Sequence, residues 1–164
     1  MHDYYSEDGP LYIILHKPTN TRWQFHFESR QYMDEIDEEI NIIEFFKSHK
    51  KIFGVFKKLG YVDYSPNQWK LGNSYYNDKM QLHREDGPAV IDADGYQAWW
   101  INGKRHREDG PAIIHADGTQ EWYLNHKDVT VEVNEWFKEY KLTYETMDEE
   151  EKMIFGFHIR SLMK

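Results

Sequence analysis

One 23-residue segment occurs twice in succession between Gln81 and His126. The first copy reads QLHREDGPAVIDADGYQAWWING and the second reads KRHREDGPAIIHADGTQEWYLNH, with fourteen identical positions. Self-similarity at a fixed short spacing indicates that each copy is one supersecondary element that packs against the next. The shared motif comprises His83, Arg84, Glu85, Asp86, Gly87, Pro88 and Trp99 in the first copy and His106, Arg107, Glu108, Asp109, Gly110, Pro111 and Trp122 in the second.

Each copy is expected to form a β-hairpin. In the first copy, residues 89–93 and 96–101 are rich in strand-forming side chains and flank Asp94-Gly95. An Asp-Gly pair between two such runs is typical of a two-residue type I′ turn, because both central residues of that turn need positive φ. Asn102-Gly103 predicts a second tight turn where the return strand ends.

The first strand of this hairpin carries small side chains on one face. Alternation along a strand places Ala89, Ile91 and Ala93 on the same side of the sheet. We expect the ring of Trp99 to pack into the space that the two alanines leave.

The 23-residue hairpin unit, with Asn-Gly-Lys-x-His between copies, resembles the MORN repeat. Where that repeat has His-Gly-x-Gly, this chain has His-Arg-Glu-Asp-Gly-Pro-Ala, which resembles the "HREDGPA" repeat family associated with tailed phages and large DNA viruses. The resemblance covers residues 74–127, and the C-terminal tail more loosely. It implies a scaffold or interaction surface whose setting is an infected cell.

Composition and charge narrow the class of protein. The chain has 164 residues, which suits one domain, and its 16% aromatic content argues against disorder despite a mean hydropathy of −0.87. The absence of cysteine excludes disulfides, thiol nucleophiles and Cys-ligated metal sites. Neither a signal peptide nor a membrane-spanning run is found, so we expect a soluble protein of the cytoplasm, the host's if the protein is viral.

A formal net charge of −9 argues against nucleic acid and anionic membranes as partners. It suits a basic protein partner, host or viral, or serves solubility alone. The charge is divided between segments, with −4 on residues 81–126 and −4 on residues 128–164. We expect no cofactor.

The N-terminal part is interpreted as a degenerate copy of the hairpin over residues 1–33. Glu7 to Pro10 repeats the turn motif, residues 11–15 and 21–27 have strand character, and Lys17 to Asn20 predicts the turn between them. The turn is two residues longer than in the full copies, and such lengthening costs little closure entropy.

Residues 34–60 have the spacing of a helix, with Asp34 as the expected N-cap and Gly60 just after its end. Gly54 is where such a helix would kink or split in two. Its apolar side is expected to cover a sheet. Residues 61–80 form a partial hairpin in this interpretation, with Gly72-Asn73 as its turn.

Residues 128–164 are expected to form helices. The first has its apolar residues at Val133, Trp136, Phe137 and Tyr140. Thr146 and Glu149 match a capping box that opens a last helix through Ser161. The apolar side of that helix is expected to comprise Ile154, Phe155, His158 and Leu162. The predicted fold is α+β: a curved antiparallel sheet of repeated hairpins whose edges are covered by an inserted helix and by C-terminal helices.

The His-Arg-Glu-Asp block is the one motif that suggests catalysis. His83, Glu85 and Asp86 have side chains that bind divalent metals, as do His106, Glu108 and Asp109, with His115 and Asp117 nearby. A block copied in register is better explained by architecture, because an active site needs a single constellation. In that interpretation Asp86 and Asp109 bond turn amides and pairs of the Glu85/Arg107 type bridge the copies, while the histidines lie half-buried beside the tryptophans.

Motifs of other enzyme classes are absent: there is no G-x-S-x-G, phosphate loop, dinucleotide fingerprint or His-Glu-x-x-His. We therefore expect a non-enzymatic interaction protein without a metal site. The alternatives are a metal-dependent hydrolase and a structural component of a viral assembly.

Two features are candidates for the interaction surface. Adjacent aromatic residues direct one ring to each face of a sheet, and the acidic run near the C-terminus adds charge, although the start of a helix also accounts for that run. The candidate residues are Trp100, Tyr123, Tyr76, Asp148, Glu149, Glu150 and Glu151. A sharper hypothesis is an inhibitor of a host defence or nucleic-acid enzyme, in which carboxylates stand in for phosphates on one contiguous acidic face.

Overall fold

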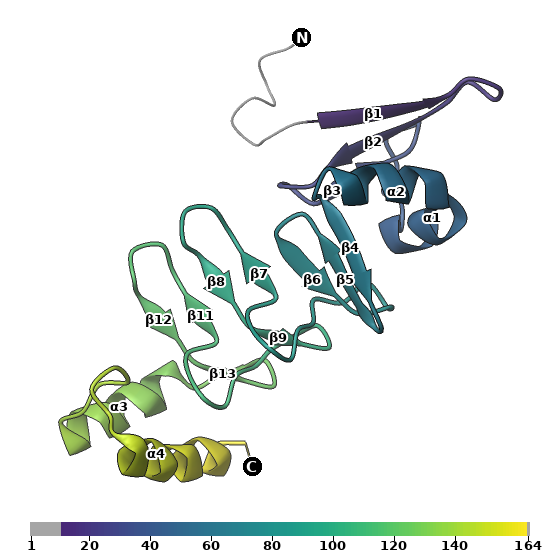
Figure 1. Cartoon of the computed structure of the whole chain (residues 1–164). Helices are drawn as coiled ribbons and strands as arrows, with labels where there is room; N and C mark the ends of the chain where they lie inside the picture. Colours follow the sequence, from purple (N-terminus) through teal and green to yellow (C-terminus); the bar gives the residue numbers. More distant parts are fainter. Residues whose placement is uncertain (1–10, 164) are drawn as a thin grey trace. The chain divides into compact units, whose positions relative to one another are not determined.

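The computed structural model describes residues 11–163 and shows an α+β protein with antiparallel hairpin strands (Figure 1). The chain, expected to form one domain, divides into two compact units, residues 1–80 and 81–164. The predicted turn motif at Glu7 to Pro10 lies outside the described residues. Within residues 11–163, no helix has the length and apolar character needed to cross a bilayer.

The first unit begins with a three-stranded antiparallel sheet of β1 (Leu11–His16), β2 (Thr21–His26) and β3 (Gln31–Met33). The predicted strands and the turn at residues 17–20 are confirmed. Strand β3 was not predicted. It pairs with β2 through a tight connection that places Arg30 at φ 61°.

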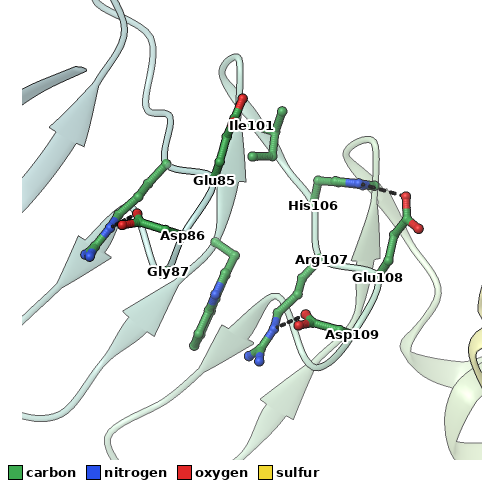
Figure 2. A pocket seen from close by; sticks show the side chains of 10 residues that line it. Glu85, Asp86, Gly87, Ile101, His106, Arg107, Glu108 and Asp109 are labelled. Atoms are coloured by element: carbon green, nitrogen blue, oxygen red, sulfur yellow. Dashed lines mark hydrogen bonds and ion pairs between the residues drawn. The ribbon is translucent and has the colours of Figure 1, made fainter. Parts of the chain in front are cut away.

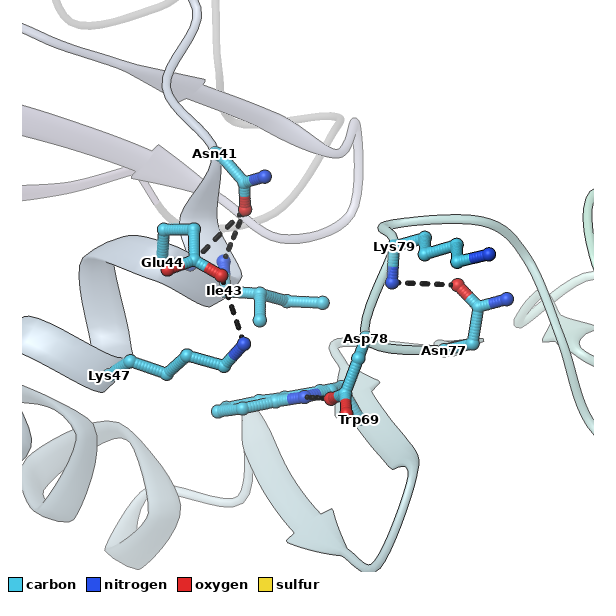
Figure 3. A network of polar contacts seen from close by, with 8 residues as sticks. All are labelled: Asn41, Ile43, Glu44, Lys47, Trp69, Asn77, Asp78 and Lys79. Carbon is cyan, nitrogen blue, oxygen red and sulfur yellow. Dashed lines mark hydrogen bonds and ion pairs between the residues drawn. The ribbon is translucent and has the colours of Figure 1, made fainter.

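A second antiparallel set in this unit comprises β4 (Val62–Ser65), β5 (Gln68–Leu71) and β6 (Ser74–Tyr76). The predicted hairpin at Gly72-Asn73 is confirmed, with Leu71 opposite Ser74. The indole of Trp69 donates to Asp78 across 2.8 Å, which ties the chain beyond β6 to the hairpin (Figure 3).

Two short helices, α1 (Ile42–Ser48) and α2 (Lys50–Lys58), replace the single helix expected from residue 34. Asp34 does not cap a helix, because its carboxylate accepts from the amides of Ile36 and Glu38 and so closes a turn. The break between the helices falls at His49, with φ −118° and ψ 58°, and Gly54 lies inside α2.

Asn41 is the N-cap of α1. Its side chain accepts from the amides of Ile43 and Glu44, at 3.1 and 3.2 Å, and Glu44 in turn pairs with Lys47 at 2.9 Å (Figure 3). Helix α2 packs against β1 and β2, since Phe56 lies 5.3 Å from Tyr12 and 5.4 Å from Phe25 between ring centroids, and α1 packs against β2 through Phe45, 5.2 Å from Phe25. The core of this unit is therefore largely aromatic.

In the second unit the strands of the two copies lie 23 residues apart. The first copy forms β7 (Val90–Ile91), β8 (Gln97–Ala98) and β9 (Trp100–Ile101), and β9 pairs with β10 (Lys104–Arg105) at the start of the second copy. The second copy forms β11 (Ile113–Ile114), β12 (Gln120–Glu121) and β13 (Tyr123–Leu124), and β13 pairs with β14 (Lys127–Asp128) just after that copy. Strand β11 pairs with β8, so the copies share one sheet (Figure 1).

The turn at Asp94-Gly95 differs from the prediction. Val90 and Ile91 pair with Ala98 and Gln97, and the amide of Asp92 donates to the carbonyl of Tyr96 at 2.9 Å. This leaves a three-residue loop, 93–95, in which only Gly95 has positive φ (99°). This is the pattern of a type I turn followed by a left-handed residue, not of a type I′ turn. The type I′ geometry occurs instead at Asn102-Gly103, with φ 50° and 76°.

The predicted buried face of the first strand is wrong in part. Ala89 is buried, but Ile91 is 39% exposed and Ala93 is also exposed. The buried cluster contains Val90, Ala98 and Ile113 instead. The strand is two residues long, so its alternation does not extend from Ala89 to Ala93.

The C-terminal helices α3 (Thr130–Tyr140) and α4 (Glu149–Ser161) pack against the second copy. The indole of Trp122, 2% exposed, meets Phe137, Tyr144 and Phe155 at centroid distances of 5.2 to 5.8 Å. The predicted role of these helices as cover for the hairpins is consistent with this packing.

Thr130 supplies a hydrogen-bond acceptor that a further copy of the repeat would otherwise supply. The amide of Trp99 donates to the carbonyl of Ala112 at 2.8 Å, and the amide of Trp122, 23 residues on, donates to the hydroxyl of Thr130 at 2.9 Å. For the amide of Trp122, a side chain in the first turn of α3 thus supplies the acceptor; for the amide of Trp99, the next hairpin supplies it.

The capping box of α4 lies two residues beyond its predicted position. Asp148 is the N-cap, and its side chain and that of Glu151 bond each other's backbone amides at 2.9 Å. Thr146 bonds Thr143 instead. Of the expected apolar side, Phe155 is buried whereas Ile154 is 48% exposed, and Ile159, which was not predicted, is fully buried.

Candidate functional site

The two His-Arg-Glu-Asp blocks form matching turns. The Nε of Arg84 donates to Asp86 at 2.8 Å and its Nη1 to the carbonyl of Pro88 at 3.3 Å. Arg107 makes the same bonds to Asp109 and Pro111 at the same distances. The expected bridge of the Glu85/Arg107 type is not formed, because Arg107 pairs within its own turn.

The histidines hold the end of each hairpin. Nδ1 of His83 accepts from the amide of Asn102, and Nδ1 of His106 accepts from Asn125, both at 3.1 Å. Each neutral ring therefore carries its proton on Nε2, which lies 3.8 Å from Glu85 in the first copy and 3.5 Å from Glu108 in the second. Both histidines are half-buried, as expected.

Arg107 bridges the copies through an aromatic contact. Its Cζ lies 4.0 Å from the centroid of the Trp99 ring. A Cβ at residue 110 would lie 2.6 Å from that Cζ, so glycine at this position leaves space for the guanidinium. Trp99 thus packs against the neighbouring turn, not into the predicted alanine face.

A groove of about 730 Å³ runs between the two turns, and we call it the turn groove (Figure 2). Its lining residues are Arg84, Glu85, Asp86, Gly87, Trp99, Ile101, His106, Arg107, Glu108 and Asp109. Ile101 was not predicted as a site residue; its place beside the repeated motif, two positions after Trp99, is the signal that could have found it.

The turn groove carries excess negative charge at its rim. Its lining includes four carboxylates and two guanidiniums. The carboxylates of Glu85, Asp86 and Asp109 are 85%, 76% and 85% exposed, and that of Glu108 is 45% exposed. Arg84 lowers the pKa of Asp86 through its hydrogen bond. Because each guanidinium is already paired with an aspartate, Glu85 and Glu108 remain as the carboxylates without an arginine partner in their own turn.

The predicted outer aromatic residues are largely covered. Trp100 and Tyr123 are half-buried, with the guanidinium of Arg105 between them at 5.2 and 5.1 Å from the ring centroids. Tyr76 belongs to the other unit and is only 7% exposed. Little of these rings is left to form a binding surface.

The acidic run at the start of α4 has local partners. Asp148 and Glu151 form the capping box, and Glu149 pairs with Lys152 at 3.2 Å. Within residues 11–163, Glu150 alone of the four has no hydrogen-bond or ion-pair partner.

The described residues do not bring three histidines, aspartates or glutamates together in a metal-binding cluster. His115 lies 2.6 Å from Glu121, and Asp117 accepts from the amide and hydroxyl of Thr119. The metal-dependent hydrolase considered as an alternative therefore gains no support from their geometry.

Comparison with protein-family models, with curated proteins and with solved structures found no match.

Proposed function

We propose that this chain is a non-enzymatic protein-protein interaction scaffold, built of MORN-like hairpin repeats in a curved sheet, that binds a basic segment of a protein partner in the turn groove. The observation that carries the proposal is the repeated set of exposed carboxylates along that groove, which lies between Glu85-Asp86 and Glu108-Asp109.

A peptide segment with Lys or Arg at alternate positions would be complementary to the carboxylates of the turn groove. Each ammonium or guanidinium of the ligand would find a carboxylate on either turn, and charge-assisted hydrogen bonds are stronger than neutral ones. A single exposed ion pair contributes only about 0–1 kcal/mol, so both turns are needed for useful affinity. Trp99 and Ile101 supply apolar surface for the aliphatic part of the ligand's side chains.

The setting we propose is the cytoplasm of an infected bacterial cell, in line with the resemblance to phage proteins. There the partner is a host protein, and the sharper version is inhibition of a defence or nucleic-acid enzyme whose basic surface the carboxylates of the turn groove would occupy in place of phosphates.

A peptide titration tests the groove without knowledge of the partner. A short peptide in which lysine alternates with alanine is added to ¹⁵N-labelled protein, and amide shifts are followed by NMR. We expect the largest changes at residues 84–87 and 106–109, weakened by salt. A peptide with glutamate in place of lysine is the control and should change nothing.

A matched pair of variants tests the biological function. Glu85→Lys/Glu108→Lys reverses charge in the turn groove, and Glu35→Lys/Glu135→Lys makes the same net change at exposed residues outside it. We expect the tagged wild-type chain and the control variant to co-purify one stoichiometric partner from infected cells, and the groove variant to lose it. If both variants recovered the partner equally, the turn groove would not be its binding site.

A further inference from the structure

Helix α4 has a second apolar face that points away from the core of its unit. Phe155 and Ile159 are buried, whereas Met153, Ile154 and Phe157 are 57%, 48% and 63% exposed. At 3.6 residues per turn, Met153 and Phe157 lie on the side of the helix opposite Phe155 and Ile159. Most surface helices have one apolar stripe, so the outer stripe needs its own explanation.

The outer stripe is flanked by opposite charges. Glu150 lies one turn before Met153, and Arg160 lies one turn after Phe157, with its Cζ 5.1 Å from the Phe157 ring centroid. Both charged residues are exposed, and Glu150 has no ion-pair partner within residues 11–163. The stripe therefore runs from acidic through apolar to basic over about 15 Å of helix.

The spacing of this stripe is symmetric about residue 155. Positions 150, 153, 157 and 160 are separated by three, four and three residues, which is the spacing of a helix-helix seam. A second α4 laid antiparallel on the first would place Glu150 opposite Arg160 at both ends and Met153 opposite Phe157 in the middle. The stripe is thus complementary to itself.

We propose that the outer face of α4 is a homodimer interface, in which the α4 helices of two copies pack antiparallel about a two-fold axis. A two-fold interface uses the same patch on both subunits, and the self-complementary charges and apolar residues meet that requirement. One helix from each copy buries little surface, so the dissociation constant is on the order of 1–100 μM.

The dimer is independent of the turn groove, since α4 contributes no residue to it. Dimerisation presents two grooves in one particle, which raises the apparent affinity for a partner with two basic segments. A negative result for the dimer therefore does not contradict binding in the turn groove, and a negative result for the groove does not contradict the dimer.

Sedimentation velocity over a concentration series through the micromolar range tests the dimer. We expect the wild-type mass to double as concentration rises and the variant Phe157→Glu to remain monomeric. The control is Val131→Glu on α3, which introduces the same charge at an equally exposed apolar residue (67%) and should dimerise as the wild type does. A wild type that stays monomeric at all concentrations, as it would if another protein occupied the face, overturns the proposal.

Charge reversal tests the antiparallel arrangement. Glu150→Arg alone sets arginine against Arg160 of the second copy, and Arg160→Glu alone sets glutamate against Glu150, so each variant should dimerise at least tenfold more weakly. An equimolar mixture of the two restores opposite charges at both ends and should dimerise as the wild type does. Circular dichroism confirms that each variant is folded. A mixture no tighter than the single variants contradicts the antiparallel pairing.

Discussion

The guanidinium of Arg107 stacks on the indole of Trp99, with 4.0 Å between Cζ and the ring centroid, and so joins the turn of one copy to the return strand of the other. The equivalent indole, Trp122, packs instead against aromatic residues of the C-terminal segment, including Phe155. The tryptophan at this position of the repeat therefore makes a cation-π contact where another copy follows, and aromatic contacts where the C-terminal helices follow.

The stack between Arg107 and Trp99 should be measurable as a coupling energy. We expect Arg107→Ala and Trp99→Leu each to destabilise the protein, and the double variant to be more stable than the sum of the two effects predicts by about 0.5–1 kcal/mol. Urea unfolding of the four proteins gives the coupling. Strictly additive effects would show that the stack contributes nothing.

Thr130→Val should cost about 1–3 kcal/mol of unfolding free energy, because it leaves the buried amide of Trp122 without its acceptor. The hydroxyl also lowers the pKa of Asp128. Thr130→Ser keeps the oxygen and should stay close to the wild type. If urea unfolding gave the same loss for both variants, the hydrogen bond, which Thr130→Ser keeps, would not be its cause.

His126→Gly should stabilise the protein by about 0.5–1 kcal/mol. His126 has φ 75°, nearly the φ of 76° at Gly103 in the same turn of the first copy, and a side chain is strained in that conformation. Loss of the ring contact with Trp100 at 6.2 Å offsets a small part of the gain. His126→Ala removes the ring but keeps the strain, so thermal unfolding should show no gain for it.

Stability should fall as pH drops from about 7 to 5.5, in part through His158. Burial beside Trp136 and Phe155 lowers the pKa of this histidine, and Glu139 partly opposes the shift. The unfolded chain therefore binds the proton first, so the contribution is present above the unfolded pKa and is lost as pH falls toward the folded one.

His158→Phe keeps an aromatic ring against Trp136 and removes the titrating group. Its unfolding free energy should change less over this pH interval than that of the wild type. An unchanged pH slope, measured by urea unfolding at both ends of the interval, would assign the effect to other groups.

The sequence predicted the hairpins well where turn chemistry is local. Asn102-Gly103 and Gly72-Asn73 form the expected connections between paired strands. Asp94-Gly95 was placed in the wrong turn type, because the loop length depends on which residues pair across the strands, here Ile91 with Gln97. Short-range preference does not determine that register.

Helix boundaries were harder to predict than helices. Asp34 and Asn41 both have side chains that cap, and the chain uses Asp34 for a turn and Asn41 for α1 because the buried residues Ile42 and Ile43 follow the latter. In α4 both sides are apolar, so spacing alone placed Ile154 in the core and missed Ile159. The turn groove was not predicted as a cavity, since it exists only where two copies meet.

The second copy supplies the carbonyl of Ala112 to the first copy, and the hydroxyl of Thr130 takes that role after the second copy. Because a turn groove needs two neighbouring turns, the number of grooves is one less than the number of copies. The number of binding sites that we propose is therefore set by the number of copies: duplication of 23 residues at the junction of Gly103 and Lys104 would add a groove and leave Thr130 at the end of the last hairpin.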